Sequence, residues 1–297
     1  RHVQRGRVGL RMHRHRLEAE ALAGAQDAAG DLAAVGDQEA FHTRRRFTSA
    51  FDPCLKVYNT TSMSKPMLSQ IFAQARAAGR SALDEPAAKR VLAAYGIAVP
   101  RGVAVPPGAR PALDGLAGPF AVKLISPDAS HKSDVGGVRL GLADAAGATA
   151  AAREMEALSK AANLQLDGVL VEEMAPAGVE LVIGGLVDAR FGPVLMLGLG
   201  GVFVEIFGDT AFRVCPIDRR DAQEMIDELR GAPLLRGARG RKPADEKQIV
   251  EALLAVGGES GLLVELEGEL AELDINPLIA SGQAAVACDA RIVLSKK

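Results

Sequence analysis

The chain has 297 residues, of which 48% are hydrophobic and 24% are charged, as in a globular protein with ample core for one large domain or two small ones. The net charge of −2 gives no electrostatic argument for a nucleic-acid or a membrane partner, and no apolar run reaches the roughly 18 residues of a membrane-spanning helix. The three cysteines, Cys54, Cys215 and Cys288, lack metal-ligand spacing and are too few for a disulfide framework, which favours a reducing cytoplasm.

Residues 1–62 differ from the rest of the chain. They contain nine Arg and one Lys against seven acidic residues, a net charge of +3, and show no regular helical or strand period. A transit peptide would be poorer in acids, and a nucleic-acid-binding arm would carry interleaved aromatic residues. We therefore expect 1–62 to be a non-native or disordered extension, with the natural product starting at Met63 and the folded domain covering 63–297.

The remaining sequence predicts helices alternating with groups of strands. Helices are expected at 68–79 and at 84–96, the second with Asp84 as its N-cap and Gly96 as its stop. The elements expected after them are strands at 97–105, 119–126 and 137–143, a helix at 144–161, strands at 168–175, 179–188, 193–201, 202–209 and 212–217, helices at 221–231 and 244–258, and strands at 271–280 and 284–294. Strands in hairpin order mixed with helices indicate an α/β or α+β protein with two lobes, at about 63–170 and 171–297.

Two neighbouring segments carry residues suited to phosphate. Lys123 lies in the apolar strand AVKLIS, where it either faces a phosphate or extends along the strand to solvent. His131 is the only histidine after Met63 and lies in SPDASHKSDVGGV, ahead of Gly136 and Gly137. A glycine pair allows the backbone to approach an anion closely, and imidazole can carry a phosphoryl group. The alternatives are an ordinary glycine turn and a structural histidine.

Acidic and amide side chains near the C-terminus are suited to a divalent cation. Asp274 and Asn276 alternate along one strand and so share a face, and Asp289 follows on the next strand. Oxygen ligands of this kind suit Mg²⁺, and the alternative is a solvated strand edge. Pro277 is expected to end the strand pairing at the rim of the sheet. In the pair Glu172 and Glu173, one side chain must face inward if its strand is half buried.

Three segments together resemble a known family: 126–138, 179–214, and ELDINPL with the later ACDARI (272–278 and 287–292). The sequence is similar, from about Leu68 to Leu294, to the ATP-grasp (β) subunit of ADP-forming acetyl-CoA synthetases, relatives of succinyl-CoA ligase. The resemblance implies an ATP-grasp fold whose two lobes grip ATP or ADP with Mg²⁺. The nucleotide-binding residues that it implies are Lys123, Gly136, Gly137, Glu172 or Glu173, Met174, Ala175 and Glu180. The implied metal ligands are Asp274, where many ATP-grasp enzymes have Glu, with Asn276 and Asp289.

The resemblance also implies a reaction, in which acid, CoA and ATP are interconverted with acyl-CoA, ADP and phosphate. His131 is implied as the second phosphoryl carrier, which exchanges the group with a histidine on a CoA-binding α subunit. Since no CoA-binding segment is found in the sequence, a separate α subunit is expected to bind CoA and the carboxylic acid. The open alternatives are an ATP/ADP-sensing regulatory module of an acyltransferase system and a stand-alone carboxylate ligase in which His131 is structural.

Overall fold

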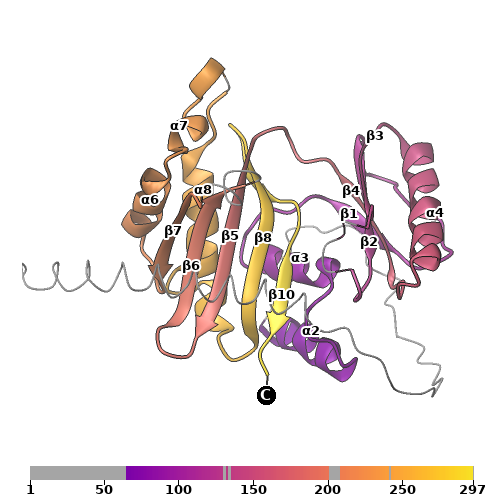
Figure 1. Ribbon diagram of the computed structural model, residues 1–297, viewed down its shortest axis with the longest axis horizontal. Coiled ribbons are helices and arrows are strands. Elements are labelled where there is room, and N and C mark those ends of the chain that lie inside the picture. The colour runs from indigo at the N-terminus through magenta and orange to yellow at the C-terminus, as the bar shows by residue number, and fades with distance from the viewer. Residues whose placement is uncertain (1–64, 130–131, 133–134, 201–207, 241, 297) are drawn as a thin grey trace, which may run out of the picture. The chain divides into compact units, whose positions relative to one another are not determined.

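The computed structural model describes residues 65–129, 132, 135–200, 208–240 and 242–296, all within one compact unit (Figure 1). The strands of this unit form two separate sheets, one of four strands and one of six, and every pair of neighbouring strands is antiparallel. The mixed architecture of helices and strands expected from the sequence is confirmed.

The smaller sheet has the strand order β1-β4-β2-β3. Its strands are β1 (Gly102–Val105), β2 (Phe120–Ile125), β3 (Val138–Leu142) and β4 (Gly168–Glu173). The alanine-rich helix α4 (Ala145–Ala161) packs on one face of this sheet (Figure 1), and Val122 and Leu124 belong to the core that it covers. Because side chains alternate along a strand, Lys123 projects from the opposite face of β2.

The larger sheet has the order β10-β8-β5-β6-β7, with β9 also paired to β8. Its strands are β5 (Val179–Asp188), β6 (Gly192–Leu199), β7 (Thr210–Val214), β8 (Leu270–Ala280), β9 (Ala285–Ala287) and β10 (Arg291–Leu294). The helical segments between β7 and β8 are α6 (Arg219–Glu228), α7 (Ala232–Leu235), the 3-10 helix η1 (Ala238–Gly240), α8 (Glu246–Gly257) and α9 (Leu262–Glu265). Buried residues of α6 to α9 share one apolar core with this sheet.

The helices α2 (Lys65–Ala77) and α3 (Glu85–Ala94) belong to that same large core. Phe72 of α2 and Leu92 of α3 are almost fully buried in it, and α3 contacts β10. The placement of these two helices differs from the expected division into lobes, which assigned them to a first lobe of 63–170. The apolar faces of both helices pack with the larger sheet. The strand β4 also runs past residue 170 within the smaller sheet. The role of 1–62 as an extension stays a prediction.

Most individual elements follow the sequence pattern. The predicted N-cap of α3 is confirmed, since the Asp84 carboxylate accepts a hydrogen bond from the Ala87 backbone N–H at 2.8 Å. The strand predicted at 179–188 coincides with β5, whereas residues 202–207 of the strand predicted at 202–209 lie outside the described residues. No described helix combines the length and the apolar composition needed to cross a bilayer.

Candidate functional site

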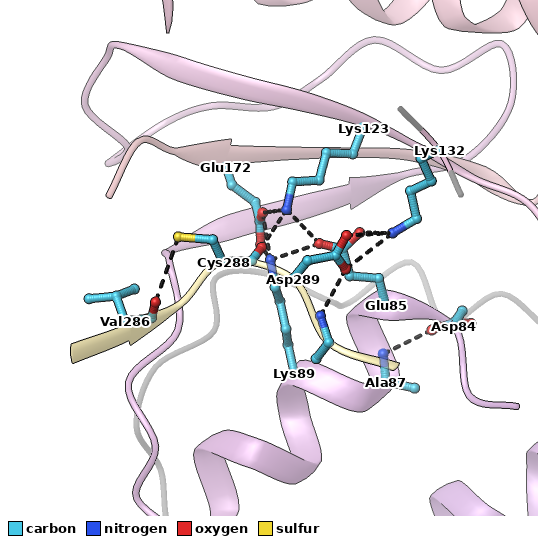
Figure 2. A network of polar contacts seen from close by, with 11 residues as sticks. Asp84, Glu85, Ala87, Lys89, Lys123, Lys132, Glu172, Val286, Cys288 and Asp289 are labelled. Carbon is cyan, nitrogen blue, oxygen red and sulfur yellow. Dashed lines mark hydrogen bonds and ion pairs between the residues drawn. The ribbon is translucent and has the colours of Figure 1, made fainter. Parts of the chain in front are cut away.

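Six charged side chains from separate parts of the chain meet beside the smaller sheet (Figure 2). We call them the lysine–carboxylate network; its members are Glu85, Lys89, Lys123, Lys132, Glu172 and Asp289. Three ammonium groups and three carboxylates balance one another in charge. Since an unpaired buried charge is very costly, this balance is what allows five of these ions to lie largely out of solvent beside the partly exposed Asp289.

The helix α3 supplies Glu85 and Lys89, which are four residues apart and therefore lie on one helix face. The side chain of Lys89 is 0% exposed and that of Glu172 is 1% exposed. The Lys89 ammonium donates to both carboxylate oxygens of Glu172, at 2.6 and 2.7 Å, and lies 2.9 Å from Glu85. This double contact joins the first turns of α3 to β4.

Lys123 of β2 points into the same network and does not extend to solvent. Its ammonium lies 2.7 Å from Glu85 and 3.2 Å from Glu172, and it also donates to the backbone carbonyl of Cys288. Burial by itself lowers the pKa of this lysine. The Glu85, Glu172 and Asp289 carboxylates outweigh that effect and hold the Lys123 pKa well above its usual value. Lys123 is therefore a fixed, fully charged cation.

Lys132, in the loop after β2, completes the network. Its ammonium donates to the second oxygen of Glu85 and lies 3.3 Å from an oxygen of Asp289. Burial lowers the pKa of Lys132, but the same two carboxylates raise it above its usual value. Burial by itself raises the pKa of the Glu85 carboxyl. The three neighbouring lysines, led by Lys123, outweigh this effect and hold that pKa well below its usual range.

Strand register places the backbone of Asp289 next to that of β8, which carries the other predicted metal ligands, Asp274 and Asn276. The register places Ala287 of β9 opposite Leu278 and Arg291 of β10 opposite Asp274, both along β8. Both registers, continued by two residues toward each other, place the backbone of Asp289 opposite that of Asn276. The exposed side chains of Asp274 and Asn276 share a face of β8, two residues apart.

The expectation that Pro277 ends the pairing is wrong, because β8 continues to Ala280 with a shift of register near the proline. Pro277 lacks an N–H but keeps its carbonyl, which accepts a hydrogen bond from the Cys288 N–H at 2.9 Å. Asp274 and Asn276 therefore lie in the middle of a strand rather than at its rim, and Asp289 lies between β9 and β10.

Two carboxylates and one amide oxygen fit Mg²⁺ in their chemistry, because this ion takes few protein carboxylates and fills its remaining positions with water and phosphate oxygens. In the part of the chain that the structure describes, no three His, Cys, Asp or Glu side chains are arranged to hold a metal by themselves. A cation here would depend on Asn276 and on a phosphate-bearing ligand.

The glycine loop is described only in part, and His131 lies outside the described residues. Gly136 has φ +68°, in the left-handed region that favours glycine. A side chain at Gly137 would be tightly placed, since a Cβ there would lie 3.0 Å from the Lys132 carbonyl and 3.1 Å from Leu124. The Gly137 N–H donates to the Lys132 carbonyl at 2.6 Å, so the glycine pair fixes the turn that presents Lys132.

The other predicted nucleotide residues follow β4 or lie on β5. Of the acidic pair, Glu172 is the inward-facing member, while Glu173 is partly exposed and accepts a hydrogen bond from the Ala117 N–H at 2.8 Å. The Met174 N–H donates to the Pro119 carbonyl at 2.9 Å, and Ala175 is partly exposed. Glu180 and Gly184 are four residues apart on β5 and therefore lie on the same face of that strand. Because Gly184 pairs with Asp274, the exposed Glu180 shares the face of Asp274 and Asn276.

Comparison with known proteins decides the family. A model of the ATP-grasp domain matches residues 74–294. The β subunit of acetate–CoA ligase (ADP-forming) I from Pyrococcus furiosus is 41% identical over 231 residues, which cover 76% of this chain and 97% of the relative. The chain belongs to the ATP-grasp β subunits of ADP-forming acetate–CoA ligases.

Solved structures agree with this ATP-grasp assignment. Acetyl-coenzyme A synthetase 1 of Candidatus Korarchaeum cryptofilum, in complex with coenzyme A, Ca-AMPCP and HgCl⁺, is 40% identical, with a TM-score of 0.70 over 76% of this chain and 99% of that one. Another structure of that enzyme contains coenzyme A and Mg-AMPPCP, with a phosphohistidine segment that points towards the nucleotide-binding site. It is 37% identical, with a TM-score of 0.64 over 77% of this chain and 100% of that one.

Two members of the network in this ATP-grasp chain, Glu85 and Lys89, were missed from sequence. The signal was present, since Glu85 and Lys89 lie three residues before Ala88 and Leu92, on the apolar face of α3. Charged residues at core-facing positions of a helix indicate a buried ion pair or a site, but no local pattern points from Lys89 to its partner Glu172, 83 residues later.

Proposed function

We propose that this chain is the nucleotide-binding β subunit of an ADP-forming acyl-CoA synthetase. The overall reaction is acid + CoA + ATP ⇌ acyl-CoA + ADP + phosphate. The observation that carries the proposal is the convergence of two charged lysines, Lys123 and Lys132, with Asp289 beside the face of β8 that bears Asp274 and Asn276. Paired ammonium groups next to hard oxygen ligands suit the phosphates of a magnesium nucleotide.

In this proposal the two lysines neutralise the phosphate oxygens, and their raised pKa values keep both charged at neutral pH. Asp274, Asn276 and Asp289 would hold Mg²⁺, which supplies charge neutralisation at the transferring phosphoryl group. The segment after β4, from Glu173 to Ala175, borders the base and ribose, and Glu180 lies on the same face as the metal ligands. The relative that binds Mg-AMPPCP supports this arrangement.

His131 is the proposed phosphoryl carrier of the chain. In the direction of ATP synthesis, an imidazole nitrogen takes the phosphoryl group from a histidine of the partner. The phosphorus–nitrogen bond on His131 then breaks as a terminal oxygen of ADP attacks, which forms ATP and restores the neutral imidazole. The phosphohistidine segment named in the related structure supports a histidine carrier in this family.

A separate α subunit is proposed to bind CoA and the carboxylic acid and to supply the first histidine. The support is that the P. furiosus relative, of which this chain covers 97%, is itself called a β subunit. We place the assembled enzyme in the cytoplasm, consistent with the two described cysteines, Cys215 and Cys288, both of which are free thiols.

Reconstitution tests the proposed function. The purified chain mixed with a matching α subunit, acetate, CoA and Mg-ATP is expected to release ADP and phosphate in equal amounts with acetyl-CoA. Neither subunit alone should do so, because the nucleotide and the CoA are bound on different polypeptides. Coupled assays of ADP and of acetyl-CoA measure the two products. A regulatory module would bind nucleotide without any acid-dependent ADP release, and that result would reject the ligase assignment.

Alanine substitutions test the metal ligands. Asp274→Ala and Asp289→Ala are each expected to weaken Mg-ADP binding by at least about tenfold, since each removes a direct ligand. Glu272→Ala is the matched control, because Glu272 is exposed on the same face of β8, two residues before Asp274. Calorimetric titrations in excess Mg²⁺ measure all three. Equal affinities across the three variants would remove the metal assignment.

A further inference from the structure

Glu85 accepts contacts from three lysines that come from three different places in the fold: Lys89 of its own helix, Lys123 of β2, and Lys132 of the following loop. We propose that Glu85 is a positioning residue that holds the ammonium groups of Lys123 and Lys132 as one pair for the nucleotide phosphates. This inference rests on the proposed function, since it needs a nucleotide to bind beside these lysines.

The two oxygens of Glu85 divide the lysines between them. Oε1 lies 2.7 Å from the Lys123 ammonium and 2.9 Å from that of Lys89, whereas Oε2 accepts from Lys132. A single carboxylate thus bridges Lys123 and Lys132 (Figure 2). Two ammonium groups that contact the same buried carboxylate repel each other, so the shared carboxylate is what makes their closeness favourable.

The attachment of α3 to the smaller sheet does not need Glu85. Lys89 already makes two short contacts with Glu172 on β4, and that pair would remain if the charge of Glu85 were removed. Burying a further carboxylate costs desolvation energy that an ion pair often fails to recover. A role in holding the two lysines accounts for a carboxylate at this position better than a role in anchoring the helix.

The partners of Lys132 point to the same conclusion. Among the described residues, its ion pairs are with Glu85 and Asp289, and Asp289 is a proposed magnesium ligand. When the Asp289 carboxylate binds the cation, Glu85 is the acceptor that keeps the Lys132 ammonium in place. Glu85 therefore matters most in the nucleotide-bound state, although it need not touch the nucleotide.

Glu85→Gln is expected to weaken Mg-ADP binding about tenfold, the scale of one charge-assisted hydrogen bond, because Lys123 and Lys132 separate toward Glu172 and Asp289. Adenosine, which has no phosphate, should bind the variant and the unchanged protein equally. The loss should appear as a raised KM for nucleotide in the reconstituted enzyme, with the KM for CoA unchanged. A helix-anchoring role would instead alter the binding of ADP and adenosine alike.

The controls separate positioning from general destabilisation. Asp209→Asn removes another buried carboxylate, one that accepts hydrogen bonds from the Arg230 and Gly231 N–H groups at 2.7 and 2.8 Å. It should lower the melting temperature without changing the preference for ADP over adenosine. Glu85→Asp keeps the charge on a shorter side chain and should retain more of the preference for ADP over adenosine than Glu85→Gln does. If the Gln variant does not fold, the Asp variant provides the comparison of ADP with adenosine.

Calorimetry with Mg-ADP and ligand-observed NMR with adenosine, both on the full chain, decide between the outcomes. If the unchanged protein fails to bind Mg-ADP, the proposed function itself is wrong. If it binds and Glu85→Gln binds Mg-ADP equally or more tightly, the positioning role is overturned and the proposed function stands. A parallel loss of ADP and adenosine binding would overturn it as well.

Discussion

Replacing His131 by Asn is expected to abolish both phosphoryl labelling of this chain and turnover of the reconstituted enzyme. Asparagine keeps a polar side chain of similar size but cannot form a phosphohistidine, so the route between the partner and ADP is cut. The unchanged chain, incubated with the α subunit, acyl-CoA and radiolabelled phosphate, should gain a label that is stable in base and lost in acid. Mg-ADP affinity should change by no more than about 1 kcal/mol, the scale of one ordinary hydrogen bond.

The matched control is His42→Asn, the same substitution within the segment expected to lie outside the folded domain. It should leave labelling and turnover unchanged. Because Mg-ADP binding is measured on the same His131 variant, a lost nucleotide site can be told apart from a lost carrier. Full ligase activity in His131→Asn would end the carrier assignment, and it would favour the reading in which this histidine is structural.

Replacing Lys89 by Met is expected to lower the free energy of unfolding by about 3–5 kcal/mol, the usual cost of removing one partner from a buried ion pair. Methionine has a similar length and fits the same space, so the change isolates the charge. The Glu172 side chain, 1% exposed, would retain Lys123 alone as a counter-ion. Urea unfolding followed by circular dichroism measures the loss.

Two further variants sharpen that measurement. Lys160→Met, at an exposed position of α4, should change the unfolding free energy by only about 0.5 kcal/mol. The double variant Lys89→Met with Glu172→Gln removes one charge of each sign and leaves the rest of the network balanced, so it should recover part of the loss. A change below about 1 kcal/mol for Lys89→Met would show that the pair contributes little to stability.

Local patterns predicted most elements of the fold because they depend on neighbouring residues. Asp84 caps α3 as expected, and the mostly apolar segment from Val179 to Asp188 forms β5. The short helices α7 and α9 were not predicted, since four residues carry too little periodicity. The membership of α2 and α3 in the larger core was also missed, because periodicity identifies an apolar face but not the sheet against which it packs.

The candidate site was predictable where the chemistry lies in one motif and unpredictable where it depends on distant pairing. Lys123 was left open between phosphate-facing and solvent-facing, and the structure places it in a buried network. The inward-facing member of the acidic pair, Glu172, could not be chosen from alternation alone. Asp274 and Asn276 shared a predicted face, but only the pairing of β9 and β10 along one edge of β8 brings Asp289 beside them.

The wide sequence spacing of the network has a consequence for the order of events in folding. Lys89 meets Glu172 across 83 residues, and Lys123 meets the Cys288 carbonyl across 165. Contacts of such separation form late, because long loops must close before any of them is made. A refolding intermediate with only the smaller sheet complete would therefore keep the contact between Lys123 and Glu172, but it would lack the partners of these residues on α3 and the ligand-bearing strand β8. Nucleotide added during refolding should be captured only in the last step, which makes ligand binding a direct readout of complete folding.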